Sequence, residues 1–365
     1  MRIFRKELKI LEVTRSEKKE IVKWINCAKC VAILAVLLDH THKILFTNEK
    51  IEWASYFSVS LFVLISGITT YKTRAKNLAL NGFRAYWQKV FGILTGYLIA
   101  TILYTIAEYG YFDFETFMDL LIHFNASGPL YFVLLYLQLM LIHRPLLYFL
   151  EKNRKLQVFY EMILLVIVVI FASYSVKYTN IMHVYGGGGK LFGATYLILF
   201  YVGMLLEKYV FSGRDFSIGK SLICMVSFGI LWLTWWQILC EKQFALEQVL
   251  GNIFGVGLNP PGVTLMISAM FMLFLCFGLF TWLERSNIIG RKLVELVNYI
   301  GCQSMYIFLF HRLILDYFLV KYVHFESRWL MRGCYLFCMI VGSIMIGGAV
   351  ELFTKFIKKI NLPTT

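Results

Sequence analysis

The chain has 365 residues, of which 59% are hydrophobic and only 16% charged, and its mean hydropathy is +0.67. Soluble globular domains carry roughly 25% charged residues, so this composition excludes an ordinary soluble protein. The formal net charge is +14. The basic residues are spread over alternate loops instead of one domain, which argues against a nucleic-acid partner and for a lipid bilayer as the partner.

Apolar runs of about 20 residues recur from one end of the chain to the other, which is the length that an α-helix needs to cross a bilayer. A transmembrane β-barrel would show short alternating segments instead, and the sequence lacks them. We therefore predict an all-α bundle of about ten transmembrane helices. The predicted spans lie near residues 24–45, 54–72, 84–107, 128–150, 156–176, 190–209, 218–240, 262–283, 298–320 and 329–354.

The loops on the N-terminal side of these spans carry most of the lysine and arginine residues. The positive-inside rule then predicts that the N and C termini are both cytoplasmic. We expect a multi-pass protein of the plasma membrane, in a bacterium the cytoplasmic membrane. Residues 1–23 are interpreted as a basic arm on the membrane surface, 24–357 as the transmembrane domain and 358–365 as a short cytoplasmic tail.

Eight cysteines are present, and most of them fall within predicted spans. Cys27 and Cys30 have the spacing of half a metal or redox motif, but no second pair accompanies them. Buried free thiols explain this pattern better than ligands do. We predict no disulfide framework and no metal site.

The first span contains two ionisable residues at its ends, Lys29 and the pair Asp39-His40. At about 100° per helical residue, the spacing from Lys29 to His40 places both side chains on one helix face, roughly 16 Å apart along the axis. Ionisable groups within a membrane usually face protein or a water-filled cavity, and they mark functional sites. An imidazole with a pKa near neutrality is also suited to general base catalysis.

Later segments add further candidates. Arg84 and Lys89 stand at the entrance of the third span, where they could hold the phosphates of a cytoplasmic donor, although ordinary positive-inside bias also explains them. Ser66-Gly67 allows the close approach of a helix or a ligand. In the ninth span, Ser304 and His311 are seven residues apart and share one face. Arg312 and Asp316 are spaced to form an ion pair along the same helix.

Several stretches resemble the acyltransferase-3 family of integral-membrane acyltransferases. Lys29 to His40 matches the family's Arg/Lys-x10-His pattern in the first span, and AILAVLLDH is similar to the apolar run that ends in this histidine. LFVLISGITTY, PLYFVLLYL with Tyr131 in place of the usual tryptophan, and YIGCQSMYIFLFH resemble three later family segments. Asn26 replaces the aspartate that usually precedes the basic residue, and Tyr86 stands where the third span usually has its first arginine.

This resemblance implies a membrane acyltransferase that takes an acyl group, commonly acetyl, from acetyl-CoA or another acyl-CoA in the cytoplasm. The acceptor would be a hydroxyl of a cell-envelope glycan on the outer side. His40 would act as the base, with Asp39 and His311 beside it as further catalytic candidates. Lys29 would stabilise the thioester oxygen or the pantetheine arm. Arg84, Lys89, Ser66, Tyr131 and Ser304 are the other candidate donor-binding residues.

Two alternatives stay open from the sequence. Buried charges in a multi-span bundle also occur in transporters and flippases, which could move an envelope glycan or lipid intermediate. The second alternative is a non-catalytic membrane sensor module on the same fold. A transporter predicts related halves or broken helices in matching positions, whereas an enzyme predicts that Lys29 and His40 are indispensable. The sequence does not predict an oligomeric state.

Overall fold

The computed structural model describes residues 2–46, 48–79, 82–152, 155–178, 193–212, 216–254 and 262–360. Within these ranges the chain forms helices and no strand, which confirms the predicted all-α class. The basic arm predicted at 1–23 continues without a break into the first span, because a single helix, α1, covers Arg2–Leu45. The tail predicted at 358–365 lies outside the described residues from position 361 onward, and α15 ends at Ile360.

Eight segments of the described chain are long and apolar enough to cross a membrane. They lie in α1, in α2 (Glu49–Ser55) with α3 (Ser58–Lys72), in α5 (Gly82–Tyr109), in η1 (Gly128–Leu130) with α7 (Tyr131–Glu151), in α8 (Gln157–Tyr178), in α10 (Ile218–Phe254), in α11 (Val263–Ser286) and in α15 (Arg328–Ile360). Shorter helices are α4 (Arg74–Ala79), α6 (Phe114–His123) and α14 (Val320–Tyr322). A ninth span is reached if one bent pair of helices counts as a single crossing.

That bent pair is the span predicted at 298–320, and here the structure corrects the expectation of one continuous helix. α12 (Ile288–Cys302) ends beside Gln303, and α13 (Ser304–Ile314) continues through η6 (Leu315–Leu319) after a bend of 68°. Gly301 lies directly before this bend and marks a close approach of α12 to α1. A Cβ at this glycine would lie 1.8 Å from the backbone oxygen of Asn26, so α12 follows α1 closely up to that point.

The span predicted at 190–209 is the other place where the count differs from ten. Residues 193–211 form η4 (Gly193–Tyr196), the ten-residue helix α9 (Leu197–Leu206) and η5 (Glu207–Phe211). Most α9 side chains are buried within the protein. α9 is too short to be counted as a span by itself, although η4, α9 and η5 follow one another without a break, and residues 190–192 lie outside the described residues.

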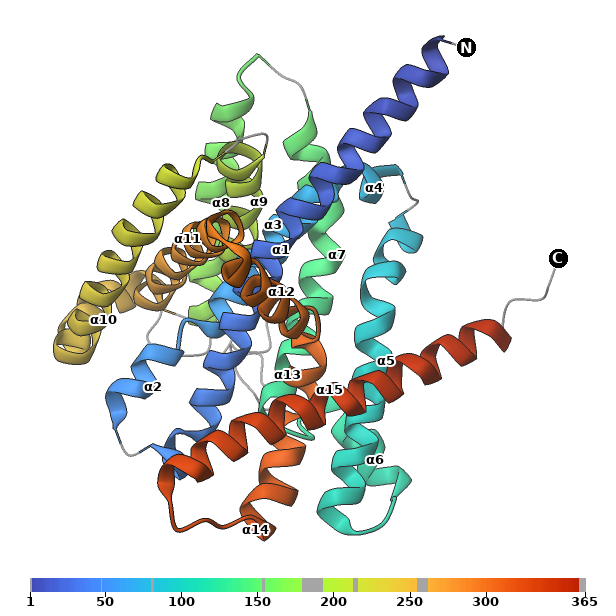
Figure 1. The fold of residues 1–365 in the computed structure, drawn as a ribbon, viewed down its shortest axis with the longest axis vertical. Helices are drawn as coiled ribbons and strands as arrows, with labels where there is room; N and C mark the ends of the chain where they lie inside the picture. Colours follow the sequence, from blue (N-terminus) through green and yellow to red (C-terminus); the bar gives the residue numbers. More distant parts are fainter. Residues whose placement is uncertain are drawn as a thin grey trace.

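α1 is the central element of the bundle. In its candidate span 67% of the residues are buried, against 6% in that of α10. It packs against α2, α3, α11, α12 and α13, and it runs through the middle of the molecule in Figure 1. Polar side chains on α1 can therefore be enclosed by protein, which is the condition that Lys29 and His40 require in a membrane.

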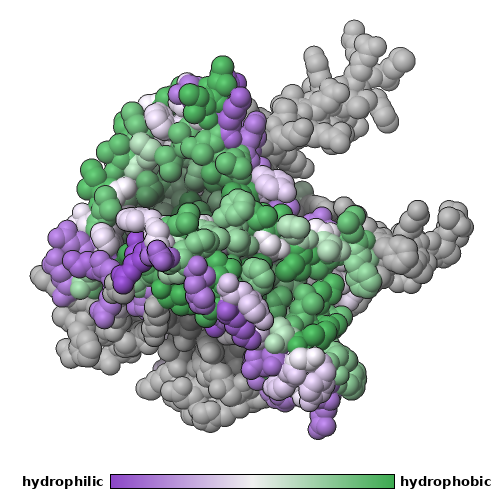
Figure 2. All heavy atoms as spheres, turned by 60° about the horizontal axis from the view of Figure 1, so that its bottom comes forward, coloured by the Kyte–Doolittle hydropathy of each residue, from purple (hydrophilic) through white to green (hydrophobic). Residues whose placement is uncertain are grey.

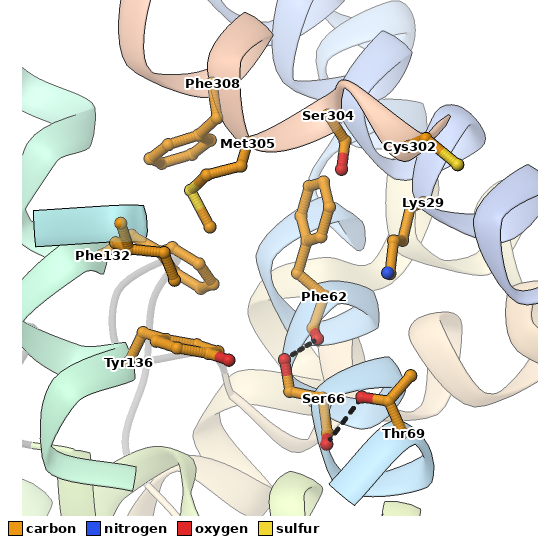
Figure 3. Close-up of a pocket in the computed structure, with 11 residues that line it drawn as sticks. Lys29, Phe62, Ser66, Thr69, Phe132, Tyr136, Cys302, Ser304, Met305 and Phe308 are labelled. Carbon is orange, nitrogen blue, oxygen red and sulfur yellow. Dashed lines mark hydrogen bonds between the residues drawn. The ribbon is translucent and has the colours of Figure 1, made fainter. Parts of the chain in front are cut away.

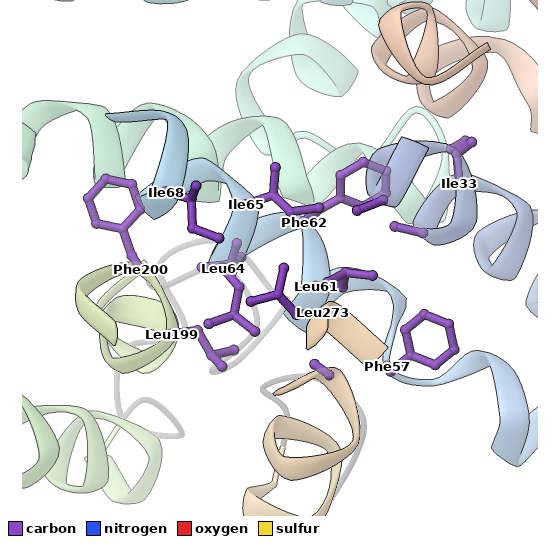
Figure 4. Packing of buried hydrophobic residues seen from close by; sticks show 14 of the residues in the cluster. Ile33, Phe57, Leu61, Phe62, Leu64, Ile65, Ile68, Leu199, Phe200 and Leu273 are labelled. Carbon is purple, nitrogen blue, oxygen red and sulfur yellow. The ribbon is translucent and has the colours of Figure 1, made fainter. Parts of the chain in front are cut away.

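α3 is the second buried element, and its close contact with α9 depends on two glycines. A Cβ on Gly67 would lie 2.0 Å from the backbone oxygen of Phe200, and one on Gly203 would lie 2.2 Å from that of Leu64. Apolar side chains of α3, such as Ile65 and Ile68, fill the space around this crossing (Figure 4). The close approach expected at Ser66-Gly67 is therefore made by a helix at Gly67.

The outer helices present apolar side chains away from the bundle. Large hydrophobic residues are exposed on α8, α10 and α15, including Phe171, Ile223, Leu233, Phe337 and Met345. On the face in Figure 2, hydrophobic residues cover wide areas and hydrophilic residues gather in bands between them. A surface of this kind suits contact with lipid chains.

Candidate active site

A cavity of about 170 Å³ lies where α1, α3, α5, α7 and the α12–α13 junction meet. Its lining contains an ammonium group, four hydroxyl groups and a thiol, and its apolar part is largely aromatic (Figure 3). The lining residues are Lys29, Phe62, Ser66, Thr69, Ile93, Phe132, Tyr136, Cys302, Ser304, Met305 and Phe308. The cavity is smaller than the roughly 300–1,000 Å³ of pockets that enclose drug-sized ligands, so it suits one end of a larger molecule.

Lys29 is held at this cavity by Asn26, one turn earlier on α1. The Lys29 Nζ donates to the Asn26 Oδ1 at 3.3 Å. The Asn26 amide nitrogen in turn donates to the Asn298 Oδ1 at 3.0 Å and to the Cys302 Sγ at 3.2 Å, both from α12. Among the described residues Lys29 has an amide partner and no carboxylate, so its charge is left to attract an anionic or carbonyl oxygen in the cavity.

The hydroxyl groups of α3 are oriented by their own helix. Ser66 donates to the Phe62 carbonyl at 2.9 Å, and Thr69 donates to the Ile65 carbonyl at 2.9 Å. Each hydroxyl proton is therefore directed to the backbone, and the oxygen lone pairs are the groups left for a ligand. These residues can accept hydrogen bonds from the amides of a bound donor.

The two histidines predicted on different spans lie next to each other. The ring centroids of His40 and His311 are 5.1 Å apart, and the rings are tilted by 30°. His311 is fully buried, and His40 is partly buried. Residues that are 271 positions apart in the sequence thus form one imidazole pair, enclosed between α1 and α13.

The hydrogen bonds of His311 fix which of its ring nitrogens carries the proton when the ring is neutral. Its Nδ1 lies 3.0 Å from the carbonyl oxygens of Ile307 and Phe308. Carbonyl oxygens only accept, so Nδ1 is the donor and Nε2 keeps its lone pair. Nε2 is buried and has no hydrogen-bond partner among the described residues. His311 is therefore poised to accept a proton at Nε2.

Charged groups surround this pair at the same end of the bundle. The predicted ion pair of Arg312 with Asp316 is confirmed, with 2.8 Å between Arg312 Nε and Asp316 Oδ2. Asp39 interacts electrostatically with Arg312 as well as with His42 and Glu52. His42 Nε2 lies 3.1 Å from Glu52 Oε2 of α2. The imidazole pair is thus bordered by groups of both signs, which can orient a polar acceptor.

The predicted residues therefore fall into two groups. Lys29, Ser66 and Ser304 line the cavity, whereas His40 and His311 form the imidazole pair with Asp39 nearby. Neither histidine lines the cavity. Tyr131 is in neither group, since its hydroxyl is hydrogen bonded to Tyr196. Arg84 and Lys89 belong to the first turns of α5, but their side chains lie outside the described residues.

Sequence reasoning missed the aromatic wall of the cavity and the role of Asn26. A helical spacing was available as a signal, because Phe62, Ser66 and Thr69 follow one face of α3, as Phe132 and Tyr136 do on α7. Such patterns also occur wherever helices pack in membranes, so they did not distinguish residues that line a cavity from residues of the packed core. Asn26 was noted only as a departure from the family pattern.

The cysteines are the remaining reactive groups of the described chain. All eight cysteines are free thiols. Across the described parts of the chain, no cluster of three or more His, Cys, Asp or Glu residues is placed to hold a metal ion. The reactive groups in the cavity lining and around the imidazole pair include imidazoles, an ammonium, a thiol, hydroxyls and carboxylates.

Comparison with known proteins adds one finding. The family model described as an acyltransferase domain, that of the acyltransferase-3 family, matches residues 22–348. Neither the curated proteins nor the solved structures that were compared contain a match to this chain. The matched range covers the cavity, the imidazole pair and nearly all of the helices. The chain therefore belongs to the acyltransferase-3 family and is a multi-pass membrane acyltransferase.

Proposed function

We propose that this acyltransferase moves an acyl group, acetyl first among the candidates, from cytoplasmic acyl-CoA to a hydroxyl of a cell-envelope glycan. The observation that carries the proposal is the arrangement of α1. One helix holds Lys29 at a cavity and His40 against His311, so a cationic site and a basic site lie at two depths of one bundle. The termini would be cytoplasmic, with the glycan approaching from the side of His40.

The donor would enter at the Lys29 end. Lys29 is partnered only by the Asn26 amide among the described residues, and the hydroxyls of Ser66 and Thr69 offer acceptors to the amides of a pantetheine arm. Arg84 and Lys89 are proposed to hold the phosphates of CoA. Both belong to the first part of α5, the helix that contributes Ile93 to the cavity lining.

The acceptor hydroxyl would be activated at the imidazole pair. A histidine nitrogen removes the proton as the hydroxyl oxygen attacks the thioester carbonyl carbon, the C–S bond breaks, and the proton is passed to the departing CoA thiolate. His40 is proposed as this base. His311, whose Nε2 is the free nitrogen, either acts in its place or relays the proton from it.

The distance along α1 assigns Lys29 one of its two possible roles. Lys29 and His40 are separated by roughly 16 Å of helix rise, so both cannot contact one thioester group at the same time. If the carbonyl carbon reacts beside the histidines, Lys29 contacts the arm or the phosphates of the donor. The ammonium group would then contribute to binding more than to the chemical step.

The direct test uses purified protein, acetyl-CoA labelled in the acetyl group and a panel of envelope glycans. We expect label on a glycan hydroxyl with wild-type protein, and its loss in His40→Ala. His123→Ala is the matched control, because it removes a partly buried histidine of α6 that pairs with Asp119 and lies in neither group. If His40→Ala keeps near-normal turnover, His40 is not the base. If the wild type transfers nothing to any acceptor while folded, a non-catalytic role is favoured.

A further inference from the structure

Three phenylalanines of the cavity lining contact one another, and one of them, Phe308, also lies against His311. The ring centroids of Phe62 and Phe132 are 6.1 Å apart, those of Phe132 and Phe308 are 5.2 Å apart, and those of Phe62 and Phe308 are 6.5 Å apart. The rings therefore form a closed triangle of contacts from three different helices, α3, α7 and α13. All three line the cavity, and their rings are labelled in Figure 3.

The order of residues along each helix places this triangle at the histidine end of the cavity. On α13, Ser304, Phe308 and His311 follow one another on one face, so Phe308 lies between a cavity residue and the imidazole pair. Its ring centroid is 6.2 Å from that of His311. On α3 and α7, Phe62 precedes Ser66 and Phe132 precedes Tyr136.

The direction of α3 and α7 agrees with this placement. α3 follows α2, which is joined to the end of α1 by the ion pair of His42 with Glu52. The first residues of α3 therefore lie toward His40. Tyr131, next to Phe132 on α7, interacts electrostatically with Asp39. On each of the three helices the phenylalanine is the cavity residue nearest to the imidazole pair.

We propose that Phe62, Phe132 and Phe308 form an aromatic wall that closes the donor cavity toward the imidazole pair and makes the site specific for short acyl groups. This inference rests on the proposed function, since it assumes that a thioester enters from the Lys29 end. The rings are almost fully buried, with exposed fractions of 9%, 4% and 4%. An apolar barrier of this size excludes water, so it keeps a waiting thioester from hydrolysis until an acceptor arrives.

The wall also limits the length of the acyl chain. The cavity volume of about 170 Å³ must hold the acyl group together with part of the pantetheine arm. A longer chain would have to displace a phenyl ring. One methylene group changes discrimination in an apolar pocket by about 10- to 200-fold. The structure thus assigns acetyl and similarly short acyl thioesters as the donor class.

Variants of the wall test both consequences with full-length protein in liposomes. In Phe308→Ala and Phe132→Ala we expect acceptor-free hydrolysis of acetyl-CoA to rise several-fold. We also expect the ratio of hexanoyl to acetyl transfer to rise by about tenfold or more. Phe308→Leu, which keeps an apolar side chain and is milder toward folding, should change both quantities in the same direction and by less.

Phe277→Ala is the matched control, because Phe277 is equally buried but packs against Trp24 and Phe211 away from the cavity. It should leave both the hydrolysis rate and the chain-length ratio as in the wild type. If folded Phe308→Ala and Phe132→Ala show the wild-type hydrolysis rate and the wild-type ratio of hexanoyl to acetyl transfer, the proposed aromatic wall is wrong. Equal changes in Phe277→Ala would also overturn it, since general loosening of the bundle would then explain them.

A measurement without any acyl-CoA separates the wall from the proposed function. Proton leak into the liposomes, followed with an entrapped pH dye, should be faster with the double variant Phe132→Ala/Phe308→Ala than with wild type or Phe277→Ala. If the wild type transfers no acyl group but the double variant leaks, the proposed function fails and the closure stands. If the double variant leaks no faster than the wild type, the closure is overturned whatever the transfer assay shows.

Discussion

The proton position on His311 is the residue-scale feature that bears most directly on mechanism. Two backbone carbonyls accept from Nδ1 and leave the Nε2 lone pair beside His40. The structural and catalytic roles of His311 can be separated by a side chain that still donates to these carbonyls but has no nitrogen in the position of Nε2. Asparagine does this, because its amide nitrogen occupies a position close to that of Nδ1.

We therefore predict that His311→Asn folds normally but loses about 10²- to 10⁴-fold in transfer rate, the usual contribution of a general base. The rate is measured with labelled acetyl-CoA and a responsive acceptor, and folding is measured by thermal unfolding in detergent. Full activity in a folded His311→Asn protein would leave His40 as the sole base of the pair.

Lys29 gives a second residue-scale prediction. If its ammonium group binds the donor arm at a distance from the reacting carbon, Lys29→Met should raise KM for acetyl-CoA with little change in kcat. Lys29→Arg keeps the charge and is the matched control, for which we expect a smaller rise in KM. A fall in kcat at unchanged KM would instead place the ammonium group at the thioester oxygen in the transition state.

The individual side chains show where sequence reasoning succeeds and where it ends. The helical period placed Lys29 and His40 on one face, and the spacing of Arg312 and Asp316 predicted their ion pair. The pairing of His40 with His311 could not be derived from spacing, since it depends on how α1 and α13 cross. The role of Asn26 also depends on such a crossing, because its partners Asn298 and Cys302 belong to α12.

At the scale of elements, glycine contacts set the distances between the helices that carry the site. Gly301 permits α12 to touch the α1 backbone at Asn26, and this contact brings Cys302 within hydrogen-bond distance of the Asn26 amide. Gly301 belongs to the stretch YIGCQSMYIFLFH, which resembles a family segment. The sequence did not predict the 68° bend that follows, because hydropathy is the same for a straight span and a broken one.

Gly301→Ala should therefore destabilise the protein by about 1–3 kcal/mol, the usual cost of overpacking, and should also raise KM for the donor by displacing Asn26 and Lys29. Gly348→Ala in α15 is the control, because no atom lies within 4 Å of the added Cβ. It should be neutral or slightly stabilising. Thermal unfolding and donor titration check both variants, and equal stability of the two would contradict the close crossing.

At the scale of the whole molecule, a buried carboxylate joins three helices at the Lys29 end of the bundle. Glu161 of α8 is fully buried, and it accepts hydrogen bonds from Lys208 and Tyr209 of η5, each at 2.6 Å, and from Gln157 at 2.7 Å. Lys208 also donates to the Leu150 carbonyl of α7 at 2.7 Å. These hydrogen bonds connect α7, α8 and η5 to each other.

Glu161→Leu leaves the Lys208 charge without its carboxylate, and we predict a loss of about 3–5 kcal/mol in stability. Glu161→Leu/Lys208→Met removes both charges and should recover much of that loss. Unfolding of the single and double variants in detergent gives the comparison. A double variant that is no more stable than the single one would show that the ion pair is not the source of the effect.

The general architecture followed from the sequence because length and hydropathy alone determine which segments can cross a bilayer. The division of residues 193–211 into η4, α9 and η5 did not follow, since hydropathy does not distinguish one type of helix from another. A single bent pair among the described helices also gives little support to a transporter, which uses broken helices at corresponding positions in two halves.

The unbroken course of α1 has a consequence for how the reaction proceeds in time. Because Lys29 and His40 belong to one continuous helix, with neither a proline nor a glycine between them, their separation stays constant during turnover. The protein cannot carry an acyl group from one to the other by moving these residues. If the donor binds as proposed, its own flexible arm has to cover the distance between the two residues, while α1 stays fixed and side chains of neighbouring helices move aside.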